Sequence, residues 1–327
     1  MSTKQTPIIE TLPYAAGQTR GLALPKVGSI HHLDLRLQIQ YDVTTGDPGY
    51  DQDFLAKLIG SLAIRDGQGH TWFSVGDGRQ LYWWAYLLYG GDVRMDAMGV
   101  SVANDQVAEA FFPIHFGINP LNPFDPTAGI PALELGSLTL EVTWRDGENL
   151  VTTPANFNID SATITVTPAE LTGPEYQAAR RNGMLRPLVR FERYDIAAAQ
   201  GEIGVQRQLP AGNIVRQTAI VVLDADDTRM DWIAGDRDVT ELGFVKVLEN
   251  TIPFREAWQT LRARLQGRRS LPAMTEWEGV SMVNWGQIAG DIAMDLRGRL
   301  PGQDVIGFTT VDTGGAIHLL HIAYAPG

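Results

Sequence analysis

The chain has 327 residues, of which 44% are hydrophobic and 20% are charged, and it contains no cysteine. This composition is typical of a folded globular protein, and the lack of cysteine excludes disulfides, thiol catalysis and Cys-based zinc or iron–sulfur sites. The formal net charge of −12 disfavours a general role in binding nucleic acid, because phosphates repel such a surface. Residues 1–21 lack the apolar core of a signal peptide, and no apolar run reaches the ~20 residues of a spanning helix. We therefore expect a soluble protein that is cytoplasmic when made.

Short strands are predicted along most of the chain. Residues 137–144 (SLTLEVTW) alternate apolar and polar or small side chains, and residues 162–166 (ATITV) do the same with β-branched residues. Residues 219–223 form a short continuous apolar strand. Residues 305–311 and 316–324 are predicted to form a hairpin through Thr313, Gly314 and Gly315.

Three helices are predicted in the connections between strands. In residues 253–267, apolar side chains recur with helical spacing at Phe254, Trp258, Leu261 and Leu265. The other two predicted helices are residues 173–182, which stop at an Asn-Gly pair, and residues 288–297, which stop before a glycine.

Two stretches of the sequence match each other at a nearly constant spacing. Leu24-Pro25 with Gly28 and Ile30 matches Leu209-Pro210 with Gly212 and Ile214, and Ile59-Gly60 matches Leu242-Gly243 further on. Tyr14 and Gln18 precede the first Leu-Pro much as Tyr194 and Gln200 precede the second. The aromatic stretch 73–89 occupies the place of the helix predicted near residue 260, and we match the closing strands as 137–144 and 317–324. These matches favour duplication over coincidence between two β-rich halves.

The duplication predicts two β units, each a sandwich or jelly roll, joined by a charged connector. We place an N-terminal arm at residues 1–20, the first unit at 21–170, the connector at 171–187 and the second unit at 188–327. The predicted fold class is all-β: two tandem jelly-roll units, each an eight-stranded β-sandwich, with a few short helices in connections.

The histidines do not predict a metal site. His31 and His32 are adjacent on a predicted strand and point to opposite faces, as do His318 and His321 at their spacing of three. His70 and His115 are isolated, so we interpret them as turn or surface residues.

Residues 223–238 are the most acidic stretch, with aspartates spaced as they are in some calcium loops. The loop lacks the central glycine and final glutamate of an EF-hand, which favours a solvated acidic loop; Asp224, Asp226 and Asp227 are the candidate calcium ligands. The sequence also lacks the phosphate-loop, dinucleotide-binding and nucleophile-elbow motifs. We therefore predict no catalytic residue and no cofactor.

Aromatic side chains crowd the stretch around Trp83 and Trp84, together with Tyr82, Tyr86 and Tyr89. Core packing is the first interpretation of this crowding. A protein interface is the second, because Trp and Tyr are favoured at contact centres.

The two Leu-Pro segments, residues 239–261 and the closing strands resemble the double jelly-roll major capsid proteins of tailless bacteriophages that contain an internal membrane. In that family three chains form a pseudo-hexagonal capsomer of an icosahedral shell. The resemblance implies a non-enzymatic virion subunit made in the host cytoplasm, which forms homotrimers and contacts neighbouring capsomers and minor capsid or vertex proteins. It further implies that the N-terminal arm lies near the internal membrane and that no specific nucleic acid is bound. Residues 119–131, which are rich in proline, have no counterpart in the second half. The alternative function is a carbohydrate-binding or carbohydrate-active β-sandwich protein.

Overall fold

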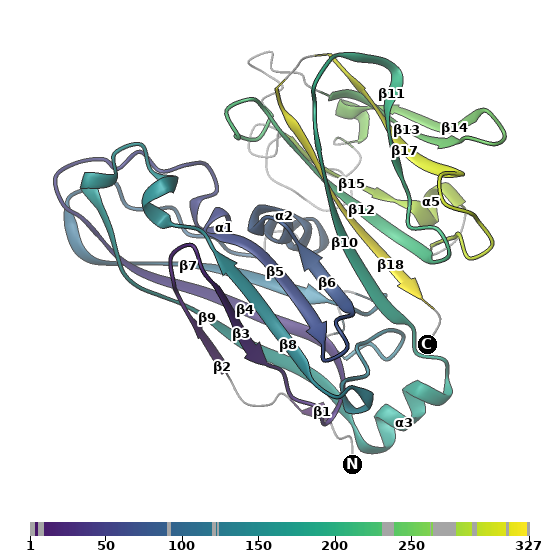
Figure 1. Cartoon of the computed structure of the whole chain (residues 1–327), viewed down its shortest axis with the longest axis horizontal. Coiled ribbons are helices and arrows are strands. Elements are labelled where there is room, and N and C mark those ends of the chain that lie inside the picture. The colour runs from purple at the N-terminus through teal and green to yellow at the C-terminus, as the bar shows by residue number, and fades with distance from the viewer. Residues whose placement is uncertain are drawn as a thin grey trace. The chain divides into compact units, whose positions relative to one another are not determined.

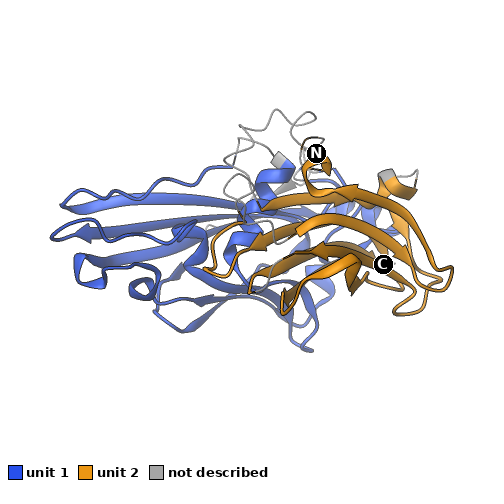
Figure 2. Cartoon of the chain, turned by 90° about the horizontal axis from the view of Figure 1, so that it is seen from above, with its two compact units in different colours: residues 1–187, 326–327 blue, residues 188–325 orange. Residues whose placement is uncertain are grey.

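The structure is a computed structural model that describes residues 4–5, 10–89, 93–119, 122, 124–230, 239–261, 263, 279–289, 293–311 and 314–325. The chain divides into two compact units, residues 1–187 with 326–327 and residues 188–325 (Figure 2). The predicted arm, first jelly roll and connector all fall in the first unit. Their separate boundaries stay predictions.

The first unit begins with three short strands and continues as an antiparallel sandwich (Figure 1). Its strands are β1 (Lys4–Gln5), β2 (Glu10–Pro13), β3 (Thr19–Ala23), β4 (Gly28–Val43), β5 (Ile59–Asp66), β6 (Thr71–Val75), β7 (Ala103–His115), β8 (Leu138–Trp144) and β9 (Phe157–Thr172). Its helices are α1 (Phe54–Lys57), α2 (Gly78–Tyr89) and α3 (Gly173–Arg181), with single 3-10 turns η2 (Ala132–Glu134), η3 (Gly147–Leu150) and η4 (Pro154–Asn156). One sheet has the order β2-β9-β4-β7, with β1 also on β9, and the other has the order β6-β5-β8-β3.

The second unit repeats this arrangement (Figure 1). Its strands are β10 (Arg186–Asp195), which begins at the boundary, β11 (Gln200–Gln208), β12 (Ile214–Leu223), β13 (Val239–Lys246), β14 (Thr251–Ala257), β15 (Val280–Asn284), β16 (Met294–Asp295), β17 (Asp304–Thr310) and β18 (Ala316–Ala325). Its labelled helix is α5 (Trp285–Ala289). One sheet has the order β10-β18-β12-β15 and the other β14-β13-β17-β11.

The strand order identifies each unit as a jelly roll. Leaving out the two-residue strands β1 and β16, the described residues of each unit supply eight strands. Numbered along the chain, these lie in the orders 1-8-3-6 and 5-4-7-2 in both units. Two four-stranded antiparallel sheets with such long-range pairing make a jelly roll. The predicted fold class and the duplication are confirmed.

The matching Leu-Pro segments occupy the same place in the two jelly rolls. Each follows the second strand, and its leucine N–H donates to the start of the seventh strand: Leu24 to the carbonyl of Leu138 at 2.8 Å, Leu209 to that of Asp304 at 3.0 Å. The glycine after each Leu-Pro pair is required for a different reason in the two units. A Cβ on Gly28 would lie 1.9 Å from the carbonyl oxygen of Leu171, whereas Gly212 has a φ of +76° in open space.

Two predicted pairings are wrong. β17 and β18 do not form a hairpin, because these two strands belong to different sheets: β17 pairs with β11 and β13, and β18 with β12. The match between the closing strands also fails. SLTLEVTW is β8, the seventh strand of its unit, and its counterpart is β17, whereas β18 corresponds to β9.

The helix predictions succeed in part. Helix α3 confirms the prediction at residues 173–182. The first third of the helix predicted at 253–267 is instead β14, where Phe254 pairs with Phe244, and helix is described at residues 258–261 and 263. The third helix is earlier than predicted: α5 ends at Ala289, and Met294 lies in β16, paired with Val215. Pairing with neighbouring strands has overridden local helical spacing.

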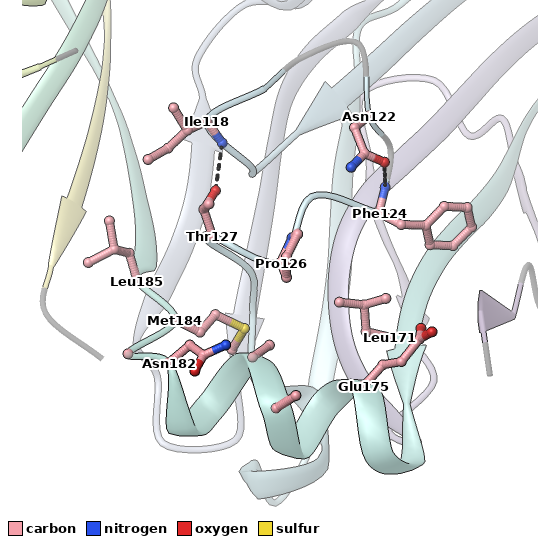
Figure 3. Close-up of a pocket in the computed structure, with 13 residues that line it drawn as sticks. Ile118, Asn122, Phe124, Pro126, Thr127, Leu171, Glu175, Asn182, Met184 and Leu185 are labelled. Atoms are coloured by element: carbon pink, nitrogen blue, oxygen red, sulfur yellow. Dashed lines mark hydrogen bonds between the residues drawn. The ribbon is translucent and has the colours of Figure 1, made fainter. Parts of the chain in front are cut away.

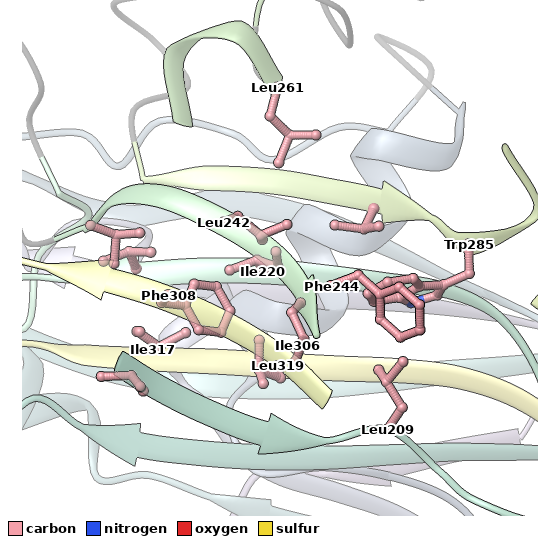
Figure 4. Packing of buried hydrophobic residues seen from close by; sticks show 14 of the residues in the cluster. Leu209, Ile220, Leu242, Phe244, Leu261, Trp285, Ile306, Phe308, Ile317 and Leu319 are labelled. Atoms are coloured by element: carbon pink, nitrogen blue, oxygen red, sulfur yellow. The ribbon is translucent and has the colours of Figure 1, made fainter. Parts of the chain in front are cut away.

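The core of the second unit lies between its two sheets (Figure 4). Ile220 of β12 and Leu319 of β18 come from one sheet, and Leu242 of β13 and Phe308 of β17 from the other; each is at most 1% exposed. In the first unit, β8 alternates buried and half-buried residues as predicted. The loop before α2 is fixed by a buried ion pair between Asp77 and Arg79 at 2.7 Å.

Candidate functional site

Histidine 31 is a satisfied core residue. Its side chain is fully buried, and a glycine at position 129 leaves room for the ring, because a Cβ there would lie 2.7 Å from its Cε1. The Nδ1–H donates to the carbonyl of Asp125 at 2.7 Å, so Nε2 accepts from the Ser29 hydroxyl at 2.6 Å. Burial lowers the pKa of His31, although backbone hydrogen bonds oppose this. Both ring nitrogens are thus engaged in hydrogen bonds within the core.

Histidine 115 is not the turn or surface residue predicted from the sequence. It is 2% exposed at the end of β7 and lies directly opposite His32 of β4. The two Nδ1 atoms are 3.3 Å apart, and Nε2 of His32 donates to Asp34 at 2.7 Å. The pairing of two strands distant in sequence makes this cluster. His70, in contrast, lies in an exposed turn beside Asp66, as predicted.

The two C-terminal histidines belong to the core of the second unit. The hydroxyl oxygen of Thr218 lies 2.8 Å from Nε1 of Trp285 and 2.8 Å from Nδ1 of His321. Since the indole can only donate, the threonine hydroxyl donates to Nδ1 of His321. Burial lowers the pKa of His321 to about 4. His318 packs edge-on against Phe191, with ring centroids 5.5 Å apart. The two histidines thus contact different partners.

The candidate calcium ligands lie in a self-contained turn. One oxygen of Asp224 accepts from the N–H groups of Asp226 and Thr228, at 3.0 and 2.9 Å. The other oxygen accepts from the Thr228 hydroxyl at 2.5 Å. The loop therefore uses Asp224 to stabilise its own backbone. Calcium binding by Asp224, Asp226 and Asp227 stays a prediction, and residues 231–238, with the remaining aspartates, lie outside the described residues.

An acidic cluster that the sequence did not single out lies at the end of the β4-β7-β9 sheet. Asp42, Asp105 and Asp160 place carboxylate oxygens within 4.8 Å of one another, and two of the three are exposed. Asp42 accepts from the N–H of Asp105 at 2.8 Å. The pKa of Asp160 is raised by burial and by its acidic neighbours. One residue comes from each of three strands, so sequence spacing gives no sign of the cluster.

The aromatic stretch around Trp83 is core, as the first interpretation held. Trp83 and Trp84 are 6% and 1% exposed on α2, and Nε1 of Trp83 donates to Asp53 at 2.9 Å. Tyr82 is 5% exposed and packs edge-on against Phe112 of β7. These three rings stabilise the first jelly roll, Tyr86 is half-buried, and the side chain of Tyr89 lies outside the described residues.

A pocket of about 690 Å³ lies in the first unit between α3 and residues 118–127 (Figure 3). Leu171, Met184 and Leu185 supply much of its apolar wall, and Thr127 closes the loop by accepting from the N–H of Ile118 at 3.2 Å. Glu175 reaches the rim, and its Oε2 is buried without a hydrogen-bond partner in the described part of the chain. The proline-rich stretch 119–131, which has no counterpart in the second half, thus builds one side of a pocket.

Comparison with known proteins yields no family model and no curated sequence that matches. Solved structures do match over the full length. The STIV major capsid protein superposes with a TM-score of 0.81 at 13% identity, over 99% of this chain and 96% of its own. PBCV-1 VP54 gives a TM-score of 0.60 at 11% identity, over 99% and 94% of the two chains. The chain has the double jelly-roll fold.

The double jelly roll is not restricted to the bacteriophage proteins to which the sequence was likened. The major capsid protein P2 of bacteriophage PM2 gives a TM-score of 0.53 at 10% identity, over 97% of this chain and 98% of its own. The higher score belongs to a protein of the Sulfolobus turreted icosahedral virus. The resemblance in fold is confirmed, and the bacteriophage source stays a prediction. In the described part of the double jelly roll, no helix combines the length and apolar character needed to cross a bilayer.

Proposed function

We propose that this double jelly roll is the major capsid subunit of an icosahedral virus, with a structural role and no catalysis. The observation that carries the proposal is its similarity to the STIV major capsid protein over nearly the whole of both chains. The repeated strand order within one chain supports it, because one such chain offers two similar building blocks to a shell.

The proposed assembly state is a homotrimer. A closed three-fold ring of chains that each contain two similar units places six units around one axis, which gives a pseudo-hexagonal outline. Such trimers tile a surface through contacts between neighbouring capsomers. The partners of this chain are therefore first of all other copies of itself.

We extend the proposal to partners that the family resemblance implies. Minor capsid or vertex proteins would fill positions where trimers do not pack regularly. Residues 1–20 would contact an internal membrane, and the chain would be made in the host cytoplasm before entering the virion. A purified trimer mixed with liposomes tests the membrane contact: co-sedimentation that is lost on deleting residues 1–9 supports it, and equal sedimentation of both forms contradicts it.

The carbohydrate-binding alternative is not supported. That function predicts exposed aromatic rings on a sheet face, but Trp83, Trp84 and Tyr82 are buried in the first unit. The matching structures named above are capsid proteins.

Molar mass in solution tests the proposed function. Three chains of 35.9 kDa give about 108 kDa, which light scattering coupled to gel filtration separates clearly from the monomer. Electron microscopy of concentrated trimers is expected to show hexagonal arrays. A stable monomer that binds an oligosaccharide on a glycan array would contradict the proposal.

A further inference from the structure

Glu170 is a fully buried carboxyl group between two strands of very different length. It lies in β9, where its cross-strand partners are Ile30 of β4 on one side and Gln5 of β1 on the other. β4 pairs with β9 from Gly28 to Val43, whereas β1 is a strand of two residues.

The surroundings of Glu170 do not compensate a negative charge. Neither carboxylate oxygen has a hydrogen-bond partner of normal geometry within the described ranges. Burial raises the pKa of Glu170 to about 7, and the nearby backbone of Val27 lowers it only in part. The titratable residues at this end of the elements packed against β9 are Lys4 on β1, Glu10 on β2, His31, His32 and Asp34 on β4, and Glu175, Tyr176, Arg180 and Arg181 on α3. Tyr176 and Arg180 both bind Glu134. His31 is engaged with Ser29 and Asp125, and His32 with Asp34.

An ionised carboxylate in this position requires water, because burying an unpaired charge is far costlier than burying the neutral acid. Water can reach Glu170 by separation of β9 from one of its neighbours. Separation from β4 would break a long ladder in the middle of the sheet, whereas separation from β1 breaks, among the described residues, the pairing of Lys4 and Gln5. The two-residue strand is therefore the side that opens.

We propose that Glu170 is a proton-dependent latch for the N-terminal strand: β1 stays paired with β9 while the carboxyl is neutral and is released when it ionises. The direction follows from the sign of linkage. A carboxyl whose pKa is raised in the closed state favours that state at low pH, and the preference is lost as pH rises through 7. The chain would thus hold β1 against β9 in mildly acidic solution and free it in mildly alkaline solution. This inference does not depend on the proposed capsid role.

Hydrogen exchange on the full-length protein tests the latch. The peptide that contains Lys4 and Gln5 is followed at pH 6 and pH 8, with rates corrected for intrinsic exchange. For a group with a pKa near 7, the protection factor is expected to fall about tenfold between these values. Glu170→Gln, which cannot ionise, is expected to keep its protection at both. Glu175→Gln is the matched control, since this half-buried carboxyl is close in sequence on α3, and it is expected to behave like the wild type.

Equal protection of the wild type at pH 6 and pH 8 overturns the proposal, as does a tenfold fall that persists in Glu170→Gln. If Glu170→Gln fails to fold, trypsin cleavage after Lys4 in the wild type gives the answer. Cleavage relative to a free peptide of residues 1–9 must accelerate with pH if the latch exists, and a constant ratio contradicts it.

Discussion

The N–H of Leu24 donates to the carbonyl oxygen of Leu138 at 2.8 Å, which ties the end of the second strand to the beginning of the seventh. The side chain of Leu24 is buried at the same point, with 5% of its surface exposed. In the second unit Leu209 makes the equivalent bond and is 1% exposed. Each leucine thus has two roles. Its N–H joins two strands of one sheet, and its side chain is buried in its own unit.

Replacing either leucine with alanine is expected to destabilise its own jelly roll. Loss of a buried leucine side chain costs about 2–5 kcal/mol, because it removes apolar contacts and leaves a cavity. Urea unfolding of Leu24→Ala and Leu209→Ala measures the loss. Leu248→Ala is the control: this leucine is 73% exposed, and its free energy of unfolding should change by less than about 0.5 kcal/mol.

The two glycines after the Leu-Pro pairs are expected to resist substitution for different reasons. Gly28→Ala places a methyl group against the carbonyl of Leu171, so β4 and β9 must move apart at that end. Gly212→Ala forces a left-handed backbone on alanine, at a cost of about 1–2 kcal/mol. Thermal unfolding checks both, against Gly298→Ala, where a methyl group meets nothing within 4 Å and φ is ordinary. A Gly28→Ala variant as stable as Gly298→Ala would contradict the close approach.

Removing the charge of Asp77 is expected to lower the free energy of unfolding strongly. Its carboxylate accepts from Arg79 at 2.7 Å and from Arg145 at 2.9 Å, and Arg79 is 2% exposed. Burial alone would raise the pKa of Asp77, but the hydrogen bonds and charges of the two arginines lower it. Asp77→Asn leaves a buried guanidinium without its counter-charge, which costs about 3–5 kcal/mol.

The control for Asp77→Asn is Asp295→Asn, which breaks an equally short but half-exposed pair with Arg297 at 2.6 Å. That change should cost less than about 1 kcal/mol in chemical denaturation. If the two variants lose the same free energy of unfolding, burial does not explain the stability that the Asp77 ion pair contributes.

Acid is expected to destabilise the second unit through His321. Because burial lowers the pKa of His321 to about 4, the unfolded chain binds a proton there before the folded unit does. Stability therefore falls as pH drops from about 6.5 to 4, by on the order of 3 kcal/mol from this group. His321→Gln should flatten that slope in urea unfolding measured across this range. An unchanged slope in the variant would assign the acid sensitivity to other groups.

The architecture was largely predictable from the sequence because turns recur. Leu-Pro and the following glycine mark the same place in each jelly roll, so a constant spacing revealed the duplication. The order of strands within each sheet was not predictable in the same way. Thr313-Gly314-Gly315 has the composition of a hairpin turn, but the strands on either side pair with partners from far along the chain. Phe254 illustrates the same effect, since pairing with Phe244 selects strand where spacing favours helix.

The chemistry of single residues was predictable where it is local. The opposite orientation of His31 and His32 follows from strand geometry, and their separate partners agree with it. Neither the contact between His32 and His115 nor the burial of Glu170 has a local signature, because both depend on which strands become neighbours. Asp160 approaches Asp42 and Asp105 for the same reason.

The position of β9 dictates when the first unit can fold. It is the last strand of its unit to be synthesised, yet it pairs with β2 on one side, where Glu10 lies opposite Val166, and with β4 on the other. At 5–20 residues per second, roughly 8–30 s separate the synthesis of β2 from that of β9. Until then one edge of β4 has no partner within its own unit, and a long strand with an open edge and one apolar face invites pairing with other chains. The nascent polypeptide, rather than the folded chain, is therefore the form that most needs protection from aggregation.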